Sequence, residues 1–356
     1  MRRNRNLAPP GEPTFFFVIS RMLLGGCVVL LAVAAAVAQQ PAVGTTLPKQ
    51  ESSATVLQQP SGNQEGFRLR VETDLVVLHV TVTDKDSKPV ADLQQEHFRV
   101  FENSVEQRLK VFKREDLPVS VGIIVDNSGS MRDKRKGVNA AALKFVRGSN
   151  ADDEVYIVNF NDEAFLDADF TDNIRLLEEG LEKIDARGGT ALYDALDLSL
   201  KHLSEKGTHD KKVLLVVTDG EDNASRLTLE QLVKTVQRSN AMIYTVGLLG
   251  GETSGSIRRA KRALEAISEA SGGAAYFPKN LDEVQAIATE IANDIRNQYV
   301  LAYTPTNSVL DGSFRKVEVR VATPKKYGKL FVRTRTGYYA ESTAVNRTQS
   351  SGLAVP

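Results

Sequence analysis

Cysteine is almost absent from this sequence, which excludes a fold stabilised by disulfide bonds. The single cysteine among 356 residues, Cys27, lies inside an apolar run near the N-terminus. The chain must therefore derive its stability from a packed core, to which a bound metal ion could add. Its 42% hydrophobic and 25% charged residues are typical of a soluble globular protein. A chain of this length is expected to form about two domains.

An excess of charge of either sign is also missing. The chain has 45 basic and 45 acidic residues. It therefore offers no general electrostatic attraction to nucleic acid or to an anionic lipid surface. We expect no nucleic-acid partner.

The local marks of common enzyme classes are absent as well. The sequence contains no G-x-S-x-G, no Walker loop and no H-E-x-x-H. A serine nucleophile needs a nearby base, and the four histidines lie outside the candidate site segments described below. The sequence thus predicts a binding protein rather than an enzyme.

The N-terminus has the layout of an export signal. Four arginines precede an apolar run over 22–38, which ends in Ala36-Val37-Ala38. This order is typical of a secretory signal peptide, residues 1–38, cleaved after Ala38. A retained membrane anchor is the alternative, because the apolar residues approach the length of a membrane span. We expect an exported protein that is periplasmic, on the cell surface or secreted, without a stable membrane span after cleavage.

Composition and periodicity divide the remainder of the chain. Residues 39–66 are polar and predict a disordered linker, and residues 341–356 predict a disordered tail. Residues 67–115 and 298–340 show the alternation of β-strands, with one strand expected over 107–112. These two β-rich segments either pack together as a small β-sandwich or are independent additions.

Strands and helices alternate between residues 118 and 297. Continuous apolar strands at 119–125 and 212–218 predict the centre of a parallel sheet that is covered on both faces. The fold class is therefore α/β, with a doubly wound, mostly parallel sheet. Such sheets bind ligands at the carboxyl ends of their strands. The acidic stretch 162–172 predicts a solvated hairpin.

Small oxygen-bearing side chains lie at these carboxyl ends in three separate segments. They are Asp126, Ser128 and Ser130 after the first apolar strand, Thr190 before a helix, and Asp219 after the second apolar strand. Carboxylates and hydroxyls are hard oxygen ligands, which suit Mg²⁺. The pattern therefore indicates a divalent-metal site. The alternative is a degenerate site in which Ser128 only caps the next helix and Asp219 only ends a strand.

The combination of D-x-S-x-S, a distant Thr and a further Asp resembles the metal-ion-dependent adhesion site (MIDAS) of von Willebrand factor type A (VWA) domains. The resemblance implies a Rossmann-like VWA domain over 118–297. It also implies that Ser128, Ser130 and Thr190 touch Mg²⁺ or Mn²⁺, while Asp126 and Asp219 bind the ion directly or through water.

The same resemblance implies an adhesion-type function. A metal ion held mainly by neutral hydroxyls keeps much of its charge and can capture an Asp or Glu carboxylate of a protein partner. The flanking segments also look like exported, acidobacterial-type VWA-related proteins. The alternative role is an envelope assembly or scaffold factor that organises a protein complex, with a structural or vestigial metal site.

Overall fold

The computed structural model describes residues 75–114, 116–183, 186–250 and 253–341. These residues belong to one compact unit of the chain, residues 69–356. The predicted signal peptide and linker, and the predicted tail beyond Glu341, lie outside the described residues. Among the helices described, none is both long and apolar enough to cross a membrane.

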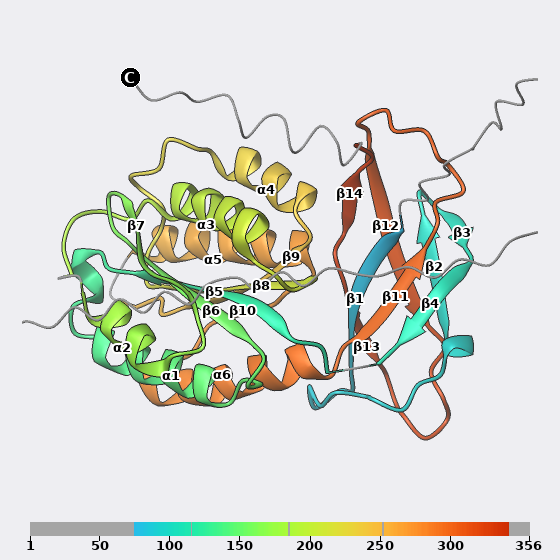
Figure 1. Ribbon diagram of the computed structural model, residues 1–356, viewed down its shortest axis with the longest axis horizontal. Coiled ribbons are helices and arrows are strands. Elements are labelled where there is room, and N and C mark those ends of the chain that lie inside the picture. The colour runs from blue at the N-terminus through green and yellow to red at the C-terminus, as the bar shows by residue number, and fades with distance from the viewer. Residues whose placement is uncertain (1–74, 115, 184–185, 251–252, 342–356) are drawn as a thin grey trace, which may run out of the picture. The chain divides into compact units, whose positions relative to one another are not determined.

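A six-stranded sheet forms the centre of the α/β domain (Figure 1). Its strands lie in the order β10-β9-β8-β5-β6-β7. Their bounds are β5 Val119–Asp126, β6 Glu154–Phe160, β7 Ala164–Thr171, β8 Lys211–Thr218, β9 Ala241–Gly247 and β10 Ala275–Tyr276. All neighbouring strands pair in parallel except β6 and β7. Every residue of β5 is buried, as expected for a strand covered on both faces.

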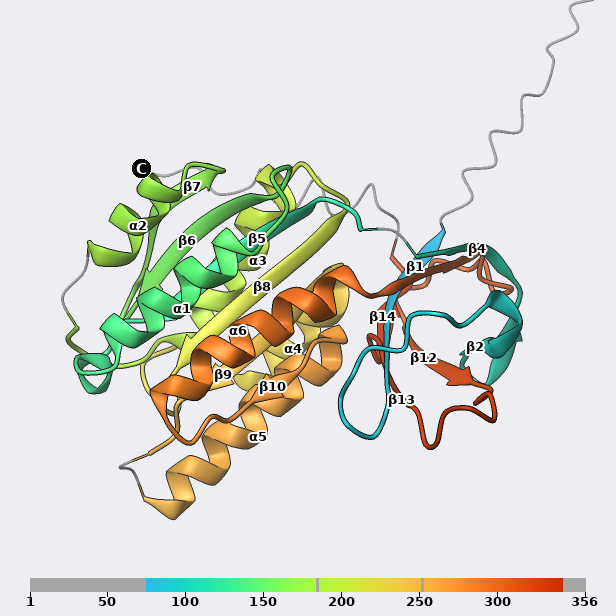
Figure 2. The ribbon, with the colours of Figure 1, turned by 90° about the horizontal axis from the view of Figure 1, so that it is seen from below.

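Helices cover both faces of this sheet (Figures 1 and 2). One face carries α1 (Arg135–Arg147), α2 (Ile174–Glu182) and α6 (Leu281–Arg296). The other face carries α3 (Leu192–Lys206), α4 (Leu229–Arg238) and α5 (Ser254–Ser271). Each set of helices shares its own apolar core with one side of the strands. The predicted doubly wound α/β fold is therefore confirmed.

The acidic stretch 162–172 forms more than a solvated hairpin. Its first residues make the turn between β6 and β7, and most of the remainder is β7 itself, the antiparallel edge strand of the sheet. Asp167 and Asp169 lie on this strand. Charged residues are tolerated there because an edge strand has one flank facing water, so the strand lacks the apolar pattern of its neighbours.

Strands from both flanks of the α/β domain combine in two four-stranded sheets. Their orders are β13-β1-β11-β4 and β14-β12-β2-β3. The bounds are β1 Val76–Thr83, β2 Phe98–Glu102, β3 Val105–Gln107, β4 Leu109–Lys113, β11 Tyr299–Tyr303, β12 Phe314–Val321, β13 Phe331–Arg333 and β14 Gly337–Tyr339. Inward side chains of both sheets, such as Leu78, Val100, Leu301 and Val319, share one core. The two β-rich segments are thus one β-sandwich.

The prediction of one strand over 107–112 was wrong. β3 and β4 are separated at Arg108 and belong to different sheets. β3 returns onto β2 through a tight turn at Asn103 and Ser104, both with positive φ. β4 pairs instead with β11. The pairing partners, which are distant in sequence, decide where this stretch breaks.

A buried ion pair lies inside the sandwich. Arg315 donates to Glu102 at 3.1 Å, and the two side chains are only 1% and 3% exposed. The hydroxyls of Tyr303 and Tyr338 also donate to Glu102, at 2.9 and 2.7 Å. The carboxylate is therefore fully engaged, as a buried charge requires.

Helix α6 leads directly into β11, and buried polar contacts hold this junction. The hydroxyl of Tyr244 in β9 donates to Asp294 of α6 at 2.8 Å, and Arg333 of β13 donates to the same carboxylate. Gln298 donates to the hydroxyl of Thr81 in β1 at 3.1 Å. The end of α6 is consequently bonded to both the α/β domain and the sandwich.

Candidate metal site

The candidate site lies where the strand order reverses. The chain proceeds from β5 to β6 on one side, and β8, β9 and β10 lie on the other side of β5. Asp126 ends β5, and Asp219 directly follows β8. Because β5 and β8 are neighbours in parallel, both carboxylates lie at the switch point, where such folds bind ligands.

Four of the five predicted residues form one hydrogen-bonded cluster. Asp126 accepts from the backbone N–H of Ser128 at 2.8 Å. The hydroxyls of Ser128 and Ser130 lie 3.1 Å apart, and Ser130 donates to Asp219 at 2.8 Å. Ser130 is the exposed member, whereas Asp126, Ser128 and Asp219 are buried. The cluster therefore opens to solvent at Ser130.

The loop that carries Thr190, the fifth residue, is tied to the other two loops through the backbone. Gly129 donates to the carbonyl of Gly188 at 3.3 Å, and Asn223 donates to the carbonyl of Thr190 at 3.0 Å. Gly188 adopts a φ of +74°, and a Cβ there would lie 2.0 Å from a carboxylate oxygen of Asp162. Glycine is thus required where the three loops converge.

Two further residues engage the carboxylates and were not assigned from sequence. Thr218, the last residue of β8, donates its hydroxyl to Asp126 at 2.6 Å. The ammonium of Lys134 lies 2.5 Å from Asp219. Burial raises the pKa of Asp126, and the hydrogen bonds from Thr218 and Ser128 oppose that rise. Thr218 could have been predicted as a site residue because it precedes Asp219 in the sequence. No local sequence pattern identifies Lys134 as a site residue.

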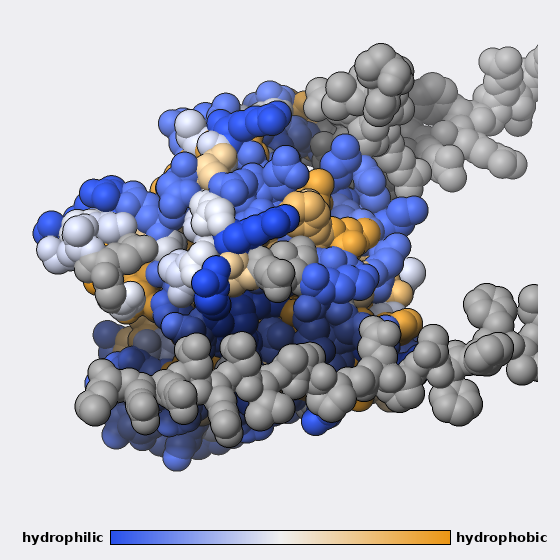
Figure 3. All heavy atoms as spheres, turned by 90° about the vertical axis from the view of Figure 1, so that its left-hand side faces the viewer, coloured by the Kyte–Doolittle hydropathy of each residue, from blue (hydrophilic) through white to orange (hydrophobic). Residues whose placement is uncertain are grey.

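The donor set fits a small divalent cation. It combines two carboxylates with three hydroxyl-bearing residues, all hard oxygen donors. Within the described ranges, no group of three or more His, Cys, Asp or Glu side chains could hold a metal, so hydroxyls are indispensable to any ligand set here. Figure 3 views the side on which β5 ends, and this surface is largely hydrophilic.

The side chain of Ser128 is not a helix cap, and the two acidic residues after Asp219 are engaged elsewhere. Ser128 begins the short 3₁₀ helix Gly129–Met131, but its side chain makes no capping hydrogen bond. Next to Asp219, Glu221 pairs with Arg259 at 2.5 Å, and Asp222 accepts from Ser225 at 2.6 Å. These two carboxylates therefore have structural partners of their own.

The histidines contact other parts of the molecule. His202 stacks on Phe170 and lies 2.9 Å from Asp169. His209 contacts the carbonyl of Asp152, and His97 that of Gln94. No hydrogen bond among the described residues joins a histidine to Ser128 or Ser130.

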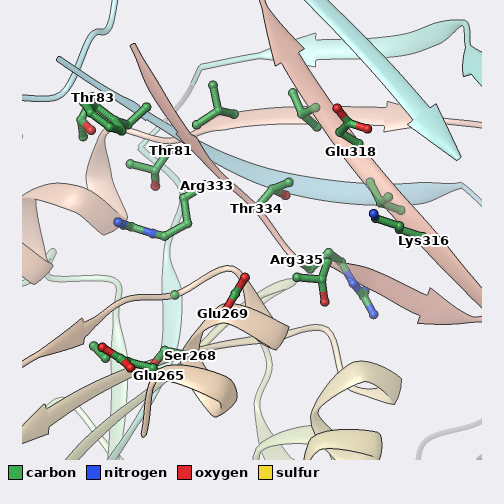
Figure 4. A pocket seen from close by; sticks show the side chains of 17 residues that line it. Thr81, Thr83, Glu265, Ser268, Glu269, Lys316, Glu318, Arg333, Thr334 and Arg335 are labelled. Carbon is green, nitrogen blue, oxygen red and sulfur yellow. The ribbon is translucent and has the colours of Figure 1, made fainter. Parts of the chain in front are cut away.

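An open groove of about 680 Å³ lies elsewhere in the molecule (Figure 4). Glu265 and Glu269 of α5 lie on one side of it, and Lys316 and Glu318 of β12 lie on the other. Arg333 also lines the groove but is already paired with Asp294. No member of the five-residue set lines this groove, which is therefore separate from the candidate metal site.

Comparison with known proteins identifies the domain. Residues 121–221 match the von Willebrand factor type A domain family. The chain contains a VWA domain. The matched segment includes all five candidate ligands and the switch point between β5 and β8.

One curated protein is similar to part of this chain. It is an uncharacterized protein of Synechocystis sp., 28% identical over 110 residues. The alignment covers 30% of this chain and 26% of the relative, so the chain spans about a quarter of that protein's length.

Solved structures similar to this chain include several bacterial proteins. The vWF domain of the type V pili tip protein Mfa5 from Porphyromonas gingivalis is 13% identical, with a TM-score of 0.43, over 51% of this chain and 95% of that one. BatB from Bacteroides thetaiotaomicron is 20% identical, with a TM-score of 0.40, over 49% and 98%. A mussel byssus protein, proximal thread matrix protein 1 with a zinc-occupied MIDAS, is 16% identical, with a TM-score of 0.45, over 55% and 50%.

Proposed function

We propose that this protein is an exported, non-enzymatic binding protein whose VWA domain uses a divalent cation to capture a carboxylate of a protein partner. The observation that carries the proposal is the cluster of Asp126, Ser128, Ser130 and Asp219 at the switch point, with the loop of Thr190 bonded beside it. These five residues are the ligand set for Mg²⁺ or Mn²⁺. The arginine-flanked apolar N-terminus supports export to the periplasm, the cell surface or the medium.

The chain's own residues hold the ligands in place before any ion binds. Thr218 and the backbone of Ser128 orient the two oxygens of Asp126, and Ser130 orients Asp219. When bound, the cation supplies a positive charge that attracts a partner's Asp or Glu. Ser130, the exposed residue of the cluster, indicates the side from which the partner approaches.

Calorimetric titration with Mg²⁺ and Mn²⁺ tests the metal site. We expect one saturable site in the wild type and at least about tenfold weaker binding in Ser130→Ala, because a donor next to Asp219 is lost. Ser204→Ala, an exposed serine on α3, is the matched control and should bind as the wild type does. Equal affinity in Ser130→Ala and wild type would refute this assignment.

A folded wild type that binds neither ion would also refute the metal-dependent function. In that case the alternative of an assembly or scaffold factor with a vestigial site gains support. Capture of the partner is tested separately, by adding an aspartate-containing peptide to the Mn²⁺-loaded protein. Binding that requires Mn²⁺ and disappears with a chelator is the expected result.

A further inference from the structure

A groove beside the metal loops lies between α1 and α2. It has a volume of about 590 Å³ and lies outside the candidate ligand set. Arg132, Arg135 and Asn139 line one wall, and Glu178 and Glu182 of α2 line the other. The groove is open to solvent, and its two walls differ in charge.

Arg135 is an incompletely bonded side chain in this groove. It is only 9% exposed. One guanidinium nitrogen, Nη2, donates to Asn159 at 3.1 Å and to the carbonyl of Leu181 at 2.5 Å. The other nitrogen, Nη1, is buried and has no hydrogen-bond partner among the described residues. A buried donor left unpaired costs about 1–3 kcal/mol.

Asn139, one turn further along α1, shows a related feature. Its Nδ2 donates to the carbonyl of Leu181 at 3.2 Å, but its buried Oδ1 has no donor in the described part of the chain. The same groove therefore contains an unpaired guanidinium N–H and an unpaired amide oxygen. Buried polar groups are normally hydrogen-bonded. The amide oxygen of Asn139 needs a donor, whereas the guanidinium N–H of Arg135 needs an acceptor, so it is the arginine that indicates an oxygen-bearing anion.

The groove adjoins the loops of the metal site. Arg132 follows Ser130 by two residues, and its Nη2 donates to the carbonyl of Ala186 at 3.2 Å. The next residue, Arg187, donates its backbone N–H to the carbonyl of Asn127 at 3.0 Å. A segment that placed one carboxylate at the metal would therefore extend its neighbouring side chains over this end of the groove.

The charges in the groove favour an acidic side chain on the wall formed by Arg132 and Arg135. Arg132 is exposed, and among the described residues no ion pair engages it. The guanidinium fork of Arg132 can bind a carboxylate through two parallel hydrogen bonds, which a point charge cannot reproduce. Arg135 contributes its unpaired Nη1. Glu178 and Glu182 on the opposite wall restrict the anion to the arginine side.

We propose that this groove binds a second acidic side chain of the partner, with Arg132 and Arg135 as its ligands. The inference rests on the metal-dependent capture proposed above, in which the first carboxylate completes the metal site. It assigns to the partner a motif of two acidic residues that are close in sequence.

The test uses the Mn²⁺-loaded full chain and synthetic glycine peptides. One peptide carries a single aspartate, and the others carry two aspartates separated by no, one or two glycines. We expect at least one two-aspartate peptide to bind about three- to tenfold more tightly than the single-aspartate peptide. Arg132→Gln should abolish this preference without changing the affinity for Mn²⁺.

Two further variants make the test specific. Arg135→Lys keeps the charge but removes the unpaired Nη1, and should also reduce the preference. Arg147→Gln removes an exposed arginine at the far end of α1, outside the groove, and should retain it.

Three outcomes would overturn the inference. If wild type binds one- and two-aspartate peptides equally, and only with Mn²⁺, the second site fails while the proposed function stands. A preference that survives in both Arg132→Gln and Arg135→Lys would show that these arginines do not bind the second carboxylate. If no peptide binds the Mn²⁺-loaded protein, both proposals fail.

Discussion

The contact between Lys134 and Asp219 predicts that this lysine opposes metal binding. The ammonium lies 2.5 Å from a carboxylate that is only 1% exposed, while the lysine side chain is 26% exposed. A divalent cation bound by Asp219 would have to compete with this ammonium for the same carboxylate. Replacing Lys134 by methionine keeps most of the apolar stem and removes the competing charge.

The size of the effect follows from Coulomb attraction in a partly buried site. Two unit charges 4 Å apart attract by about 1 kcal/mol in water and by about 4 kcal/mol at an effective dielectric constant of 20. Because Lys134 remains partly solvated, we take about 1–2 kcal/mol for the pair. Lys134→Met should therefore bind Mg²⁺ and Mn²⁺ about five- to thirtyfold more tightly than the wild type.

The same substitution should have opposite effects on stability with and without metal. When a chelator removes the metal, the buried carboxylate of Asp219 has no charged partner in Lys134→Met. The free energy of unfolding should therefore fall by about 1–3 kcal/mol relative to the wild type. With saturating Mn²⁺, tighter binding should reverse at least part of this loss. Calorimetric titration measures the affinity, and urea unfolding with and without Mn²⁺ measures the stability.

A matched control is available on the same helix. Lys144 is exposed near the end of α1, so Lys144→Met should leave metal affinity and stability almost unchanged. Metal affinity in folded Lys134→Met equal to or weaker than that of the wild type would refute the competition argument.

Three further predictions concern pH and stability. Burial and nearby cations lower the pKa of His79 from 6.5 to about 3. Below about pH 6.5 the unfolded chain therefore takes up a proton that the folded chain does not, and the free energy of unfolding should fall by at most about 1.4 kcal/mol per pH unit. An equally steep pH profile of urea unfolding in His79→Gln would contradict this. Glu102→Gln should lower the free energy of unfolding by about 3–5 kcal/mol because Arg315 loses its buried counter-charge; a loss below about 1 kcal/mol in urea would contradict it. A Cβ on Gly122 would lie 2.4 Å from a buried tyrosine ring, whereas one on Gly250 would meet nothing within 4 Å. Gly122→Ala should therefore lower the free energy of unfolding, measured by thermal unfolding, by about 1–3 kcal/mol, and Gly250→Ala should lower it much less.

Much of the candidate site could be predicted because its residues follow short local rules. Asp126, Ser128 and Ser130 lie within five residues after a strand, so one loop presents all three. The hydrogen bond from Ser130 to Asp219 required only that β5 and β8 be neighbours. The contact of Lys134 could not be predicted, because it depends on how the first turn of α1 approaches the loop after β8.

The groove between α1 and α2 could not be predicted from the sequence either. No motif in the sequence distinguishes Arg132 and Arg135 from other basic residues. Only the packing of α2 against α1 buries Arg135 and leaves one of its nitrogens without a partner. An unpaired donor of this kind depends on the three-dimensional surroundings of a single nitrogen atom, so sequence periodicity cannot predict it.

The order of strands and helices between residues 118 and 297, apart from β7, and the apolar character of β5 and β8 were determined by the sequence alone. Those features arise from the local periodicity of apolar residues, which does not depend on how the segments pack together. The tertiary structure alone decided that 107–112 divides between two sheets, that β7 closes the edge of the central sheet, and that both flanks share one sandwich. These outcomes depend on pairing between segments up to about 250 residues apart, such as Thr81 and Arg333, and the sequence of one strand does not identify its partner.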